Sequence, residues 1–495
     1  MTKWTLSVAS IKSGMTKRAF SAVSIKLVMT ESEFIIKQEQ IMQREEFRIL
    51  STTAILGYGF PLGSFEEGMK RNPHLIAVDA GSTDPGPYYL GAGVSFTDRD
   101  AVKRDLEIMI KAGVERDIPV SIGTAGGSGG APHLEWNREI IEEIARENNL
   151  HFKLAVIHSE LPKDMIKAEL RTGKIMTLDP APELTEKTID DTTRIVAQMG
   201  VQPFIEAHKN DAQVILAGRA YDPAVFAALA VHRGYDMGLA THLGKILECA
   251  AICAIPGSGS DCMFGYIGSD YFKVEPLSSV RKCTTVSVAA HTLYEKTDPC
   301  ILPGPGGYLD LTDAKFEQET DNIVKVSGSK FVPGQDFFVK LEGAKRIGYR
   351  TVSIAGTRDP IMMQKIDDII HGVKERVADN FRDRENTYTL NFIIYGRDGV
   401  MGNLEPNRLK SLSHEYGIII EAVAETQELA NTICATARST MLHYGYEGRR
   451  ATAGNLAFPY SPSDFKAGEV YEFSVYHLMK VDDPASLFPI DYIEL

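Results

Sequence analysis

The stretch PVSIGTAGGSGGAPHLEWNREIIEEIARENNLHFKLAVI, residues 119–157, decides the fold class. It predicts a short apolar strand over Pro119–Gly123, a glycine-rich turn over Thr124–Gly130, a helix over His133–Leu150 and a second strand over Phe152–Ile157. Apolar residues line one face of the helix at helical spacing, whereas the strands are continuous apolar runs. Strands joined through a helix lie parallel, and continuous apolar strands are typical of a sheet covered on both faces.

The same pattern extends through the first half of the chain. Three further apolar runs end in glycine or polar residues, at Arg48–Leu56, Leu75–Asp79 and Val214–Ala217. Helical spacing follows over Asp100–Ala112 and Ala224–Val231. This alternation predicts an α/β domain over residues 46–300 with a doubly wound, mostly parallel sheet.

After about residue 256 the predicted strands become longer and alternate more clearly. Helices are expected over Pro360–Asn380 and Glu425–His443, and the Gly/Pro stretch Leu302–Gly307 is a candidate hinge. The pattern predicts an α+β domain over residues 301–495. The expected strands are Thr284–Ala290, Tyr308–Leu311, Ile323–Val326, Arg350–Ile354, Tyr388–Tyr395, Ile418–Val423 and Val470–Tyr476.

The first 45 residues are set apart from both domains. Residues 1–30 contain lysine and arginine but no acid, and residues 7–16 recur in part fourteen positions later. We expect residues 1–45 to be a disordered or upstream extension, or else a targeting segment, since basic, serine-rich starts also occur in transit peptides. The expected location is cytoplasmic, with organelle import through residues 1–30 as the alternative.

Composition and charge exclude several classes of protein. The 495 residues are 44% hydrophobic and 24% charged, which is typical of a globular protein with two or three domains. The net charge of −13 argues against a nucleic-acid partner, and no apolar run is long enough for a membrane span. Six cysteines make neither a disulfide scaffold nor a zinc motif. An acidic body of this size suits a homo-oligomer.

Candidate binding residues follow the predicted strands, because ligands of parallel α/β sheets bind outside the carboxyl ends of the strands. The backbone amides of Gly126, Gly127, Ser128 and Gly129 could surround an anion at the start of a helix. The alternative is a tight structural turn. Arg219 and Asp222 follow Val214–Ala217, where the guanidinium could bind a carboxylate or phosphate or pair with Asp222.

Candidate proton-transfer residues occupy similar positions. Asp79, His158 and Glu160 follow strands, and His133 and His208 could also act as bases, although a histidine is often only a hydrogen-bonded structural residue. Asp79, Asp84, His158, Glu160 and His208 could bind a divalent metal, but no ligand motif with fixed spacing supports one. The metal and the cofactor therefore stay open.

A glycine pattern provides a third alternative. Gly57, Gly59 and Gly63 resemble a dinucleotide loop, and Asp79 lies twenty residues after Gly59, as a ribose-binding acid would. However, Pro61 interrupts the loop, and only about nine residues remain for the crossover helix. A nicotinamide or flavin site is therefore an alternative rather than the main prediction.

Several motifs together resemble one known family. They are ILAGRAYDPA at 215–224, HLGKILEC at 242–249, the glycine-rich segment 123–130, DAGSTDP at 79–85 and GNLAFP at 454–459. From about Arg48 to about Met479 the chain resembles the acyclic terpene utilisation AtuA family. It departs from the family where Ala250 and Ala251 follow Glu248-Cys249, since a glycine is usual there.

The resemblance implies a role in the catabolism of acyclic terpenes such as citronellol and geraniol, which passes through branched, unsaturated carboxylic acids and their CoA thioesters. Together with the strand-end residues, it predicts a lyase, hydratase or isomerase that acts on a small carboxylate or acyl-CoA without a redox cofactor. The alternatives are a non-catalytic subunit or binding module of an acyl-CoA pathway complex, and a nicotinamide- or flavin-dependent oxidoreductase. The expected partner is the small molecule, not a nucleic acid or a membrane.

Overall fold

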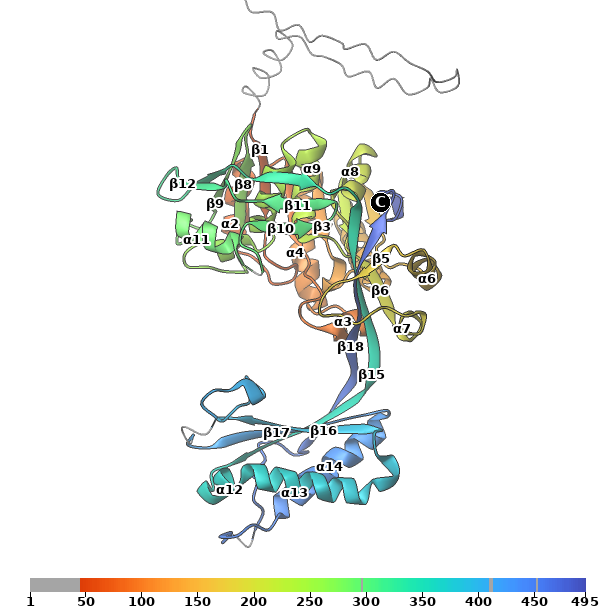
Figure 1. The fold of residues 1–495 in the computed structure, drawn as a ribbon. Helices are drawn as coiled ribbons and strands as arrows, with labels where there is room; N and C mark the ends of the chain where they lie inside the picture. Colours follow the sequence, from red (N-terminus) through yellow and green to blue (C-terminus); the bar gives the residue numbers. More distant parts are fainter. Residues whose placement is uncertain (1–44, 295–296, 409–412, 451–452) are drawn as a thin grey trace, which may run out of the picture. The chain divides into compact units, whose positions relative to one another are not determined.

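A ten-stranded sheet is the centre of the computed structural model, with the strand order β12-β13-β9-β8-β1-β2-β3-β7-β4-β19 (Figure 1). The structure describes residues 45–294, 297–408, 413–450 and 453–495, so the prediction for residues 1–45 lies almost entirely outside it. The five central strands are parallel: β1 (Phe47–Ser51), β2 (Leu75–Asp79), β3 (Val120–Gly123), β7 (Val214–Ala217) and β4 (Lys153–Ile157).

Antiparallel strands flank this parallel centre. They are β8 (Met263–Ile267), β9 (Tyr271–Pro276), β13 (Val324–Ser327) and β12 (Lys315–Gln318) beside β1, and β19 (Ile490–Glu494) beside β4. Since β12, β13 and β19 follow residue 300, the sheet draws strands from both predicted domains.

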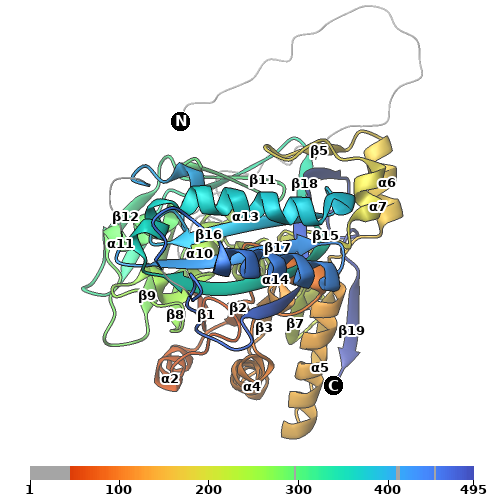
Figure 2. The ribbon, with the colours of Figure 1, turned by 90° about the horizontal axis from the view of Figure 1, so that it is seen from below.

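Helices cover both faces of the sheet (Figure 2). In β2, Leu75 and Ala77 belong to one core, whereas Ile76 and Val78 belong to the other. One face packs against α2 (Leu62–Lys70), α4 (Arg99–Glu115) and α5 (Ala131–Asn148). The other packs against α8 (Val201–Lys209), α9 (Asp222–His232) and α10 (Met237–Leu247). The predicted doubly wound α/β fold is confirmed.

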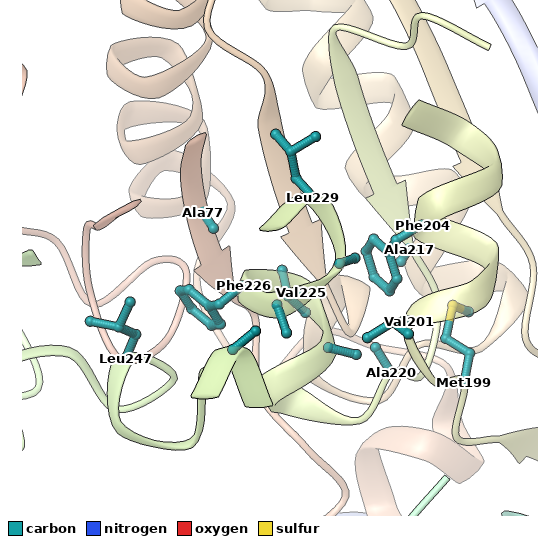
Figure 3. Packing of buried hydrophobic residues seen from close by; sticks show 14 of the residues in the cluster. Ala77, Met199, Val201, Phe204, Ala217, Ala220, Val225, Phe226, Leu229 and Leu247 are labelled. Carbon is teal, nitrogen blue, oxygen red and sulfur yellow. The ribbon is translucent and has the colours of Figure 1, made fainter. Parts of the chain in front are cut away.

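The core that contains Leu75 and Ala77 is packed around α9. Phe226 and Val225 of α9 lie among side chains of the sheet and of neighbouring elements, with Phe204 of α8 close by (Figure 3). Alanines at 224, 227, 228 and 230 are almost fully buried, so α9 is apolar all round and its first residue, Asp222, is fixed in place.

Between β3 and β7 the helix that follows the strand changes from one face of the sheet to the other, and this is the switch point of the fold. The chain leaves β3 toward α5 on the first face, and it leaves the neighbouring β7 toward α9 on the second. The loops after β3 and β7 therefore lead to opposite faces of the sheet, and ligands of folds of this class bind near such a switch point.

The C-terminal part has the order β15 (Phe337–Thr357), α12 (Pro360–Gln364), α13 (Ile366–Asn380), β16 (Tyr388–Tyr395), β17 (Tyr416–Ala424), α14 (Gln427–His443) and β18 (Asp464–Val481). Its antiparallel sheet has the order β16-β17-β15-β18, followed by β5 (Ile175–Thr177). This is the split βαβ, ferredoxin-like arrangement, and it agrees with the expected α+β texture. The long strands β15 and β18 continue toward the first part of the chain, where β15 also pairs with β6 (Arg194–Ala197).

Two segments differ from the sequence-based expectation. Thr284–Ala290 was predicted as a strand but belongs to helix α11 (Thr285–Thr292), because Thr284 and Ser287 form a reciprocal capping box that starts a helix. The candidate hinge Leu302–Gly307 is a tight hairpin between β10 (Ile301–Gly304) and β11 (Gly307–Asp310), to which β14 (Lys330–Pro333) pairs. The remaining helices are α3 (Pro87–Ala92), α6 (Lys163–Arg171) and α7 (Glu186–Asp191).

Candidate active site

A cavity of about 920 Å³ opens beside the loop that follows β7. Its walls come from that loop, the start of α9, the end of α10, the β10–β11 hairpin and the near ends of β15 and β18. Gly306, at φ +77°, allows the tight turn of the hairpin, and a Cβ there would lie 2.5 Å from the Phe337 ring. Segments from both halves of the chain therefore build one cavity. We call it the switch-point cavity.

Four charged residues form an alternating chain along the cavity wall. Lys340 Nζ lies 2.6 Å from Glu342 Oε1, Glu342 Oε2 accepts from Arg219 Nε at 2.6 Å, and Arg219 Nη1 donates to Asp222 Oδ1 at 2.9 Å. The inner pair is buried, with side-chain exposure of 3% for Arg219 and 1% for Glu342. The outer members reach the cavity surface, with 22% for Lys340 and 27% for Asp222.

The charges in this chain reinforce one another. Burial alone would raise the pKa of Glu342, but Arg219 and Lys340 outweigh it and lower that pKa to about 2. Burial would likewise lower the pKa of Arg219, but Glu342 and Asp222 raise it above its ordinary value. Both groups are therefore ionised at neutral pH. The row of four side chains ends in the ammonium group of Lys340 on one side and in the carboxyl group of Asp222 on the other.

A second ion pair closes the end of α10. Lys245 Nζ donates to Glu248 Oε1 at 2.6 Å, and both side chains are almost fully buried while lining the cavity. Burial opposes the charge on Lys245, yet Glu248 keeps its pKa above the ordinary value. Burial and the negative Glu248 raise the pKa of the neighbouring Cys249, which keeps it as a thiol.

Asp79 ends β2 behind these groups. Its carboxyl is buried, and Oδ1 has no hydrogen-bond partner among the described residues. Burial and the negative charges of Asp222 and Glu248 raise its pKa well above the ordinary value, against the opposing effect of Arg219. Asp79 can therefore hold a proton at a pH where an ordinary aspartate has lost it.

The glycine-rich loop has a packing role beside Arg219. The amides of Gly127, Ser128 and Gly129 already donate to the carbonyls of Thr124 and Ala125. A Cβ on Gly129 would lie 2.1 Å from the Arg219 nitrogen, so only glycine permits this approach. Neither Gly126 nor these three residues line the cavity. Their anion-binding role stays a prediction that the geometry does not support.

Ser159 ties the two loops of the switch point together. Its hydroxyl donates to the Gly129 carbonyl at 2.8 Å and accepts from the Arg219 amide at 2.6 Å. Thr124 Oγ1 accepts from the Ala220 amide at 3.2 Å. The loop after β3 therefore holds the backbone of Arg219 in place instead of contacting the cavity.

His133 and Glu160 lie outside the cavity lining, at the start of α5. His133 Nε2 lies 3.1 Å from the carbonyl oxygens of Tyr89 and Val94, and burial lowers its pKa to about 4. Glu160 Oε2 accepts from the Ala131 amide at 2.8 Å, so it serves the N-terminus of α5. Both side chains thus have structural contacts.

His158 and His208 also lie away from the cavity. His158 Nε2 is 2.8 Å from Asp491 Oδ2 of the edge strand β19. His208 lies near the end of α8, shortly before β7 begins, so it is at the amino-terminal ends of the parallel strands and not at the carboxyl ends, where the cavity lies. Burial lowers its pKa to about 3. Proton-transfer roles for these residues stay untested predictions.

The dinucleotide-like loop is already occupied by a side chain. Asp105 Oδ2, from α4, accepts from the amides of Gly57 and Gly59 at 3.0 Å each. These are the amides that a pyrophosphate would need, and the buried carboxylate leaves no room for a second anion there. In the described part of the chain, no three His, Cys, Asp or Glu side chains gather in a way that could hold a metal ion.

The charged residues that pair around Arg219 and at the end of α10, Lys340, Glu342, Lys245 and Glu248, were not among the candidates from the sequence. Lys245 and Glu248 stand three residues apart in an otherwise apolar helix, and that spacing was a usable signal for a buried ion pair. Lys340 and Glu342 carry no such local signal, because they meet Arg219 only through the pairing of β15 with distant strands.

Comparison with known proteins identifies the family. The model of the acyclic terpene utilisation family protein AtuA matches residues 100–257 and 278–464. The chain belongs to the AtuA family. The matched residues include Arg219, Asp222, Lys245, Glu248, Lys340 and Glu342, so all four ion pairs described above lie within the family region. No curated protein and no solved structure matches the chain. Among its described helices, none has both the length and the apolarity needed to cross a bilayer.

Proposed function

We propose that this AtuA-family protein is an enzyme of the lyase, hydratase or isomerase type, and that its substrate, a small carboxylate or its CoA ester, binds in the switch-point cavity. The observation that carries the proposal is the gathering of Arg219, Lys245 and Lys340 with three paired carboxylates around one cavity. The cavity lining also contains Asp84 and Asp336, so these three cations lie among a larger number of acids. A cavity of this size is within the usual range for small-molecule sites.

Lys340 is the residue we assign to the substrate carboxylate or carbonyl oxygen. Its ammonium reaches the cavity surface, is held by Glu342 and lies 5.1 Å from the centre of the Tyr476 ring. A fixed cation at a carbonyl oxygen stabilises the negative charge that develops there when a neighbouring carbon loses its proton. Arg219 and Lys245 are more deeply buried and pair with Glu342, Asp222 and Glu248.

Asp222 is the residue we assign to proton removal. It pairs with Arg219 at 2.9 Å, stands at the first turn of α9 and reaches the cavity surface. A carboxylate at this position can take a proton from a carbon next to the substrate carbonyl. Asp79 has a raised pKa but does not line the cavity, so we assign it no step there.

The apolar residues of the cavity suit a branched hydrocarbon chain. Leu178, Ile301, Phe338 and Leu478 line the cavity, and Leu478 lies directly opposite Lys340 in the pairing of β15 with β18. Apolar side chains beside a fixed cation fit an amphiphilic acid, with the carboxylate at Lys340 and the branched chain along the neighbouring apolar residues.

The direct test is calorimetric titration of the whole chain with a panel of branched and unsaturated carboxylates and their CoA esters, followed by mass-spectrometric detection of product. Lys340→Met should weaken binding about tenfold or more, since a charge-assisted contact is lost. Lys187→Met, which removes an 82% exposed lysine outside the cavity lining, should bind as the unsubstituted protein does. Absence of binding across the panel contradicts the proposal. Binding without turnover favours a non-catalytic subunit.

A further inference from the structure

Along the main strand orders of the three sheets, six strands form edges in the described residues, and five of them resist the addition of another strand. A further edge, β6, pairs with β15 off the main order, has only four residues and carries Arg194. The edges β12 (KFEQ) and β19 (IDYIE) carry charged residues. The edges β10 (ILPG) and β14 (KFVP) contain proline, which lacks the amide that a new partner would need, and β5 has only three residues. Charges, proline and short length are the usual protections of a sheet edge.

The sixth edge, β16, has none of these protections. Its sequence, YTLNFIIY over Tyr388–Tyr395, has eight residues without a charge, a proline or a glycine. It pairs with β17 in continuous register, without a bulge. An antiparallel strand directs half of its amides and carbonyls to each side, so a row of them points away from β17. At the end of the strand the Ile394 carbonyl already accepts from the amides of Arg397 and Asp398, so a partner strand would pair with the part before it.

The side chains of β16 also support a regular strand at an interface. Leu390, Phe392 and Ile394 face the core beneath α13 and α14, whereas Thr389 and Asn391 are exposed on the other face. This alternation fixes which side chains of β16 face the core. A partner strand could therefore shift only by an even number of residues without turning its own side chains to the wrong face.

Exposed apolar residues gather in the chain directly after the strand. Tyr395 ends β16 and is 49% exposed, and the turn that follows exposes Val400, Met401 and Leu404 by 88%, 50% and 79%. A Cβ on Gly399 would lie 2.9 Å from the Tyr395 nitrogen, so this turn folds back onto the end of the strand. We call Tyr395, Val400, Met401 and Leu404 the apolar turn.

We propose that β16 is the edge through which two copies of this chain pair, antiparallel and about a twofold axis, to form a continuous twelve-stranded sheet. A twofold axis places the same strand opposite itself, and β16 fits this arrangement because it contains no charge that would face its own copy. Copies with a net charge of −13 repel each other over most of their surface. An uncharged edge beside the apolar turn is where that repulsion is smallest. The pairing does not depend on the activity proposed above.

The test is light scattering coupled to gel filtration on the whole chain, from low to high micromolar concentration. The expected mass is twice 54.5 kDa, falling toward 54.5 kDa on dilution. The double variant Thr389→Lys and Asn391→Lys places two ammonium groups on the exposed face of the edge and should stay at 54.5 kDa. Its matched control, Thr432→Lys and Ser439→Lys on the exposed face of α14, should dimerise as the unsubstituted chain does.

A monomeric unsubstituted chain at high micromolar concentration would overturn the proposal. So would an edge variant that remains dimeric. Hydrogen exchange of the unsubstituted chain gives a second measurement if the variant does not fold: amides of β16 that point away from β17 should become protected as concentration rises. Exchange that does not change with concentration would count against pairing, and protection that appears only with another protein would assign the edge to that partner instead.

Discussion

Arg219, at the carboxyl end of β7, and Glu342, in β15, form a buried ion pair of 2.6 Å across 123 residues of sequence. The pair joins the strand that ends at the switch point to the strand that continues into the ferredoxin-like part. Lys340 and Asp222 extend it to the cavity surface on either side. The geometry of the cavity therefore depends on this contact.

Removing one partner should destabilise the fold. Glu342→Gln leaves the buried guanidinium of Arg219 with only the carboxylate of Asp222 as a charged partner. We expect the free energy of unfolding to fall by about 3 kcal/mol. Urea unfolding followed by circular dichroism measures it. Glu472→Gln, which breaks the 3.0 Å pair with Lys345 in a half-exposed part of the same two strands, should cost less than about 1 kcal/mol. Equal losses for the two variants would contradict a structural role for the pair.

The same contact predicts a pH dependence of stability. The pKa of Glu342 is about 2 in the folded chain against an ordinary value of 4.5, so its contribution is complete above pH 4.5 and is lost as the pH falls toward 2. Urea midpoints measured over this range should fall less steeply for Glu342→Gln than for the unsubstituted protein. Parallel pH profiles would show that Glu342 is not held ionised by Arg219 and Lys340.

Asp79 should have the opposite pH dependence. Its pKa is raised in the folded chain, so the relative stability it contributes is present below its ordinary pKa of 3.8 and is lost as the pH rises through the folded value. Asp79→Asn removes the cost of ionising a buried carboxyl. The variant should therefore melt higher than the unsubstituted protein at pH 8 but not at pH 4, as measured by scanning fluorimetry. A melting temperature lowered equally at both pH values would contradict the raised pKa.

Asp105 should be a structural residue of the loop Gly57–Gly59. Asp105→Ala removes the acceptor of two amides at 3.0 Å and leaves them unsatisfied, which should cost about 2–4 kcal/mol in urea unfolding. Glu107→Ala on the same helix removes a 38% exposed carboxylate and should change stability by less than about 0.5 kcal/mol. A near-neutral Asp105→Ala would leave the loop free for an anion after all.

Much of the fold could be predicted from local pattern. Apolar runs alternating with helical spacing indicate a parallel sheet covered on both faces, and the structure has that sheet at its centre. Arg219 and Asp222 are three residues apart at a strand end, so their proximity follows from sequence alone, and the ion-pair alternative is the contact observed. The strand expected at Thr284–Ala290 was wrong because its capping residues outweigh its β-branched composition.

The rest of the site depends on contacts that no local pattern encodes. Lys340 and Glu342 alternate in a strand whose register with β6 and β18 brings them to Arg219. Conversely, His133 has a sequence position that suggests catalysis, and only its contacts with two carbonyl oxygens show a structural histidine. Glycines at a strand end indicate a close backbone approach, and at Gly129 the approaching group is the protein's own Arg219.

Proton removal from a carboxylate or acyl-CoA substrate in the switch-point cavity, as proposed above, is visible by proton NMR in D₂O as deuterium uptake at the carbon next to the carbonyl of each compound that binds. We expect uptake with the unsubstituted protein and none with Asp222→Asn. The variant should still bind the compound in calorimetry, since Lys340 is unchanged. Uptake that continues undiminished in Asp222→Asn, or compounds that bind to the unsubstituted protein without any uptake, would contradict the proposed proton removal.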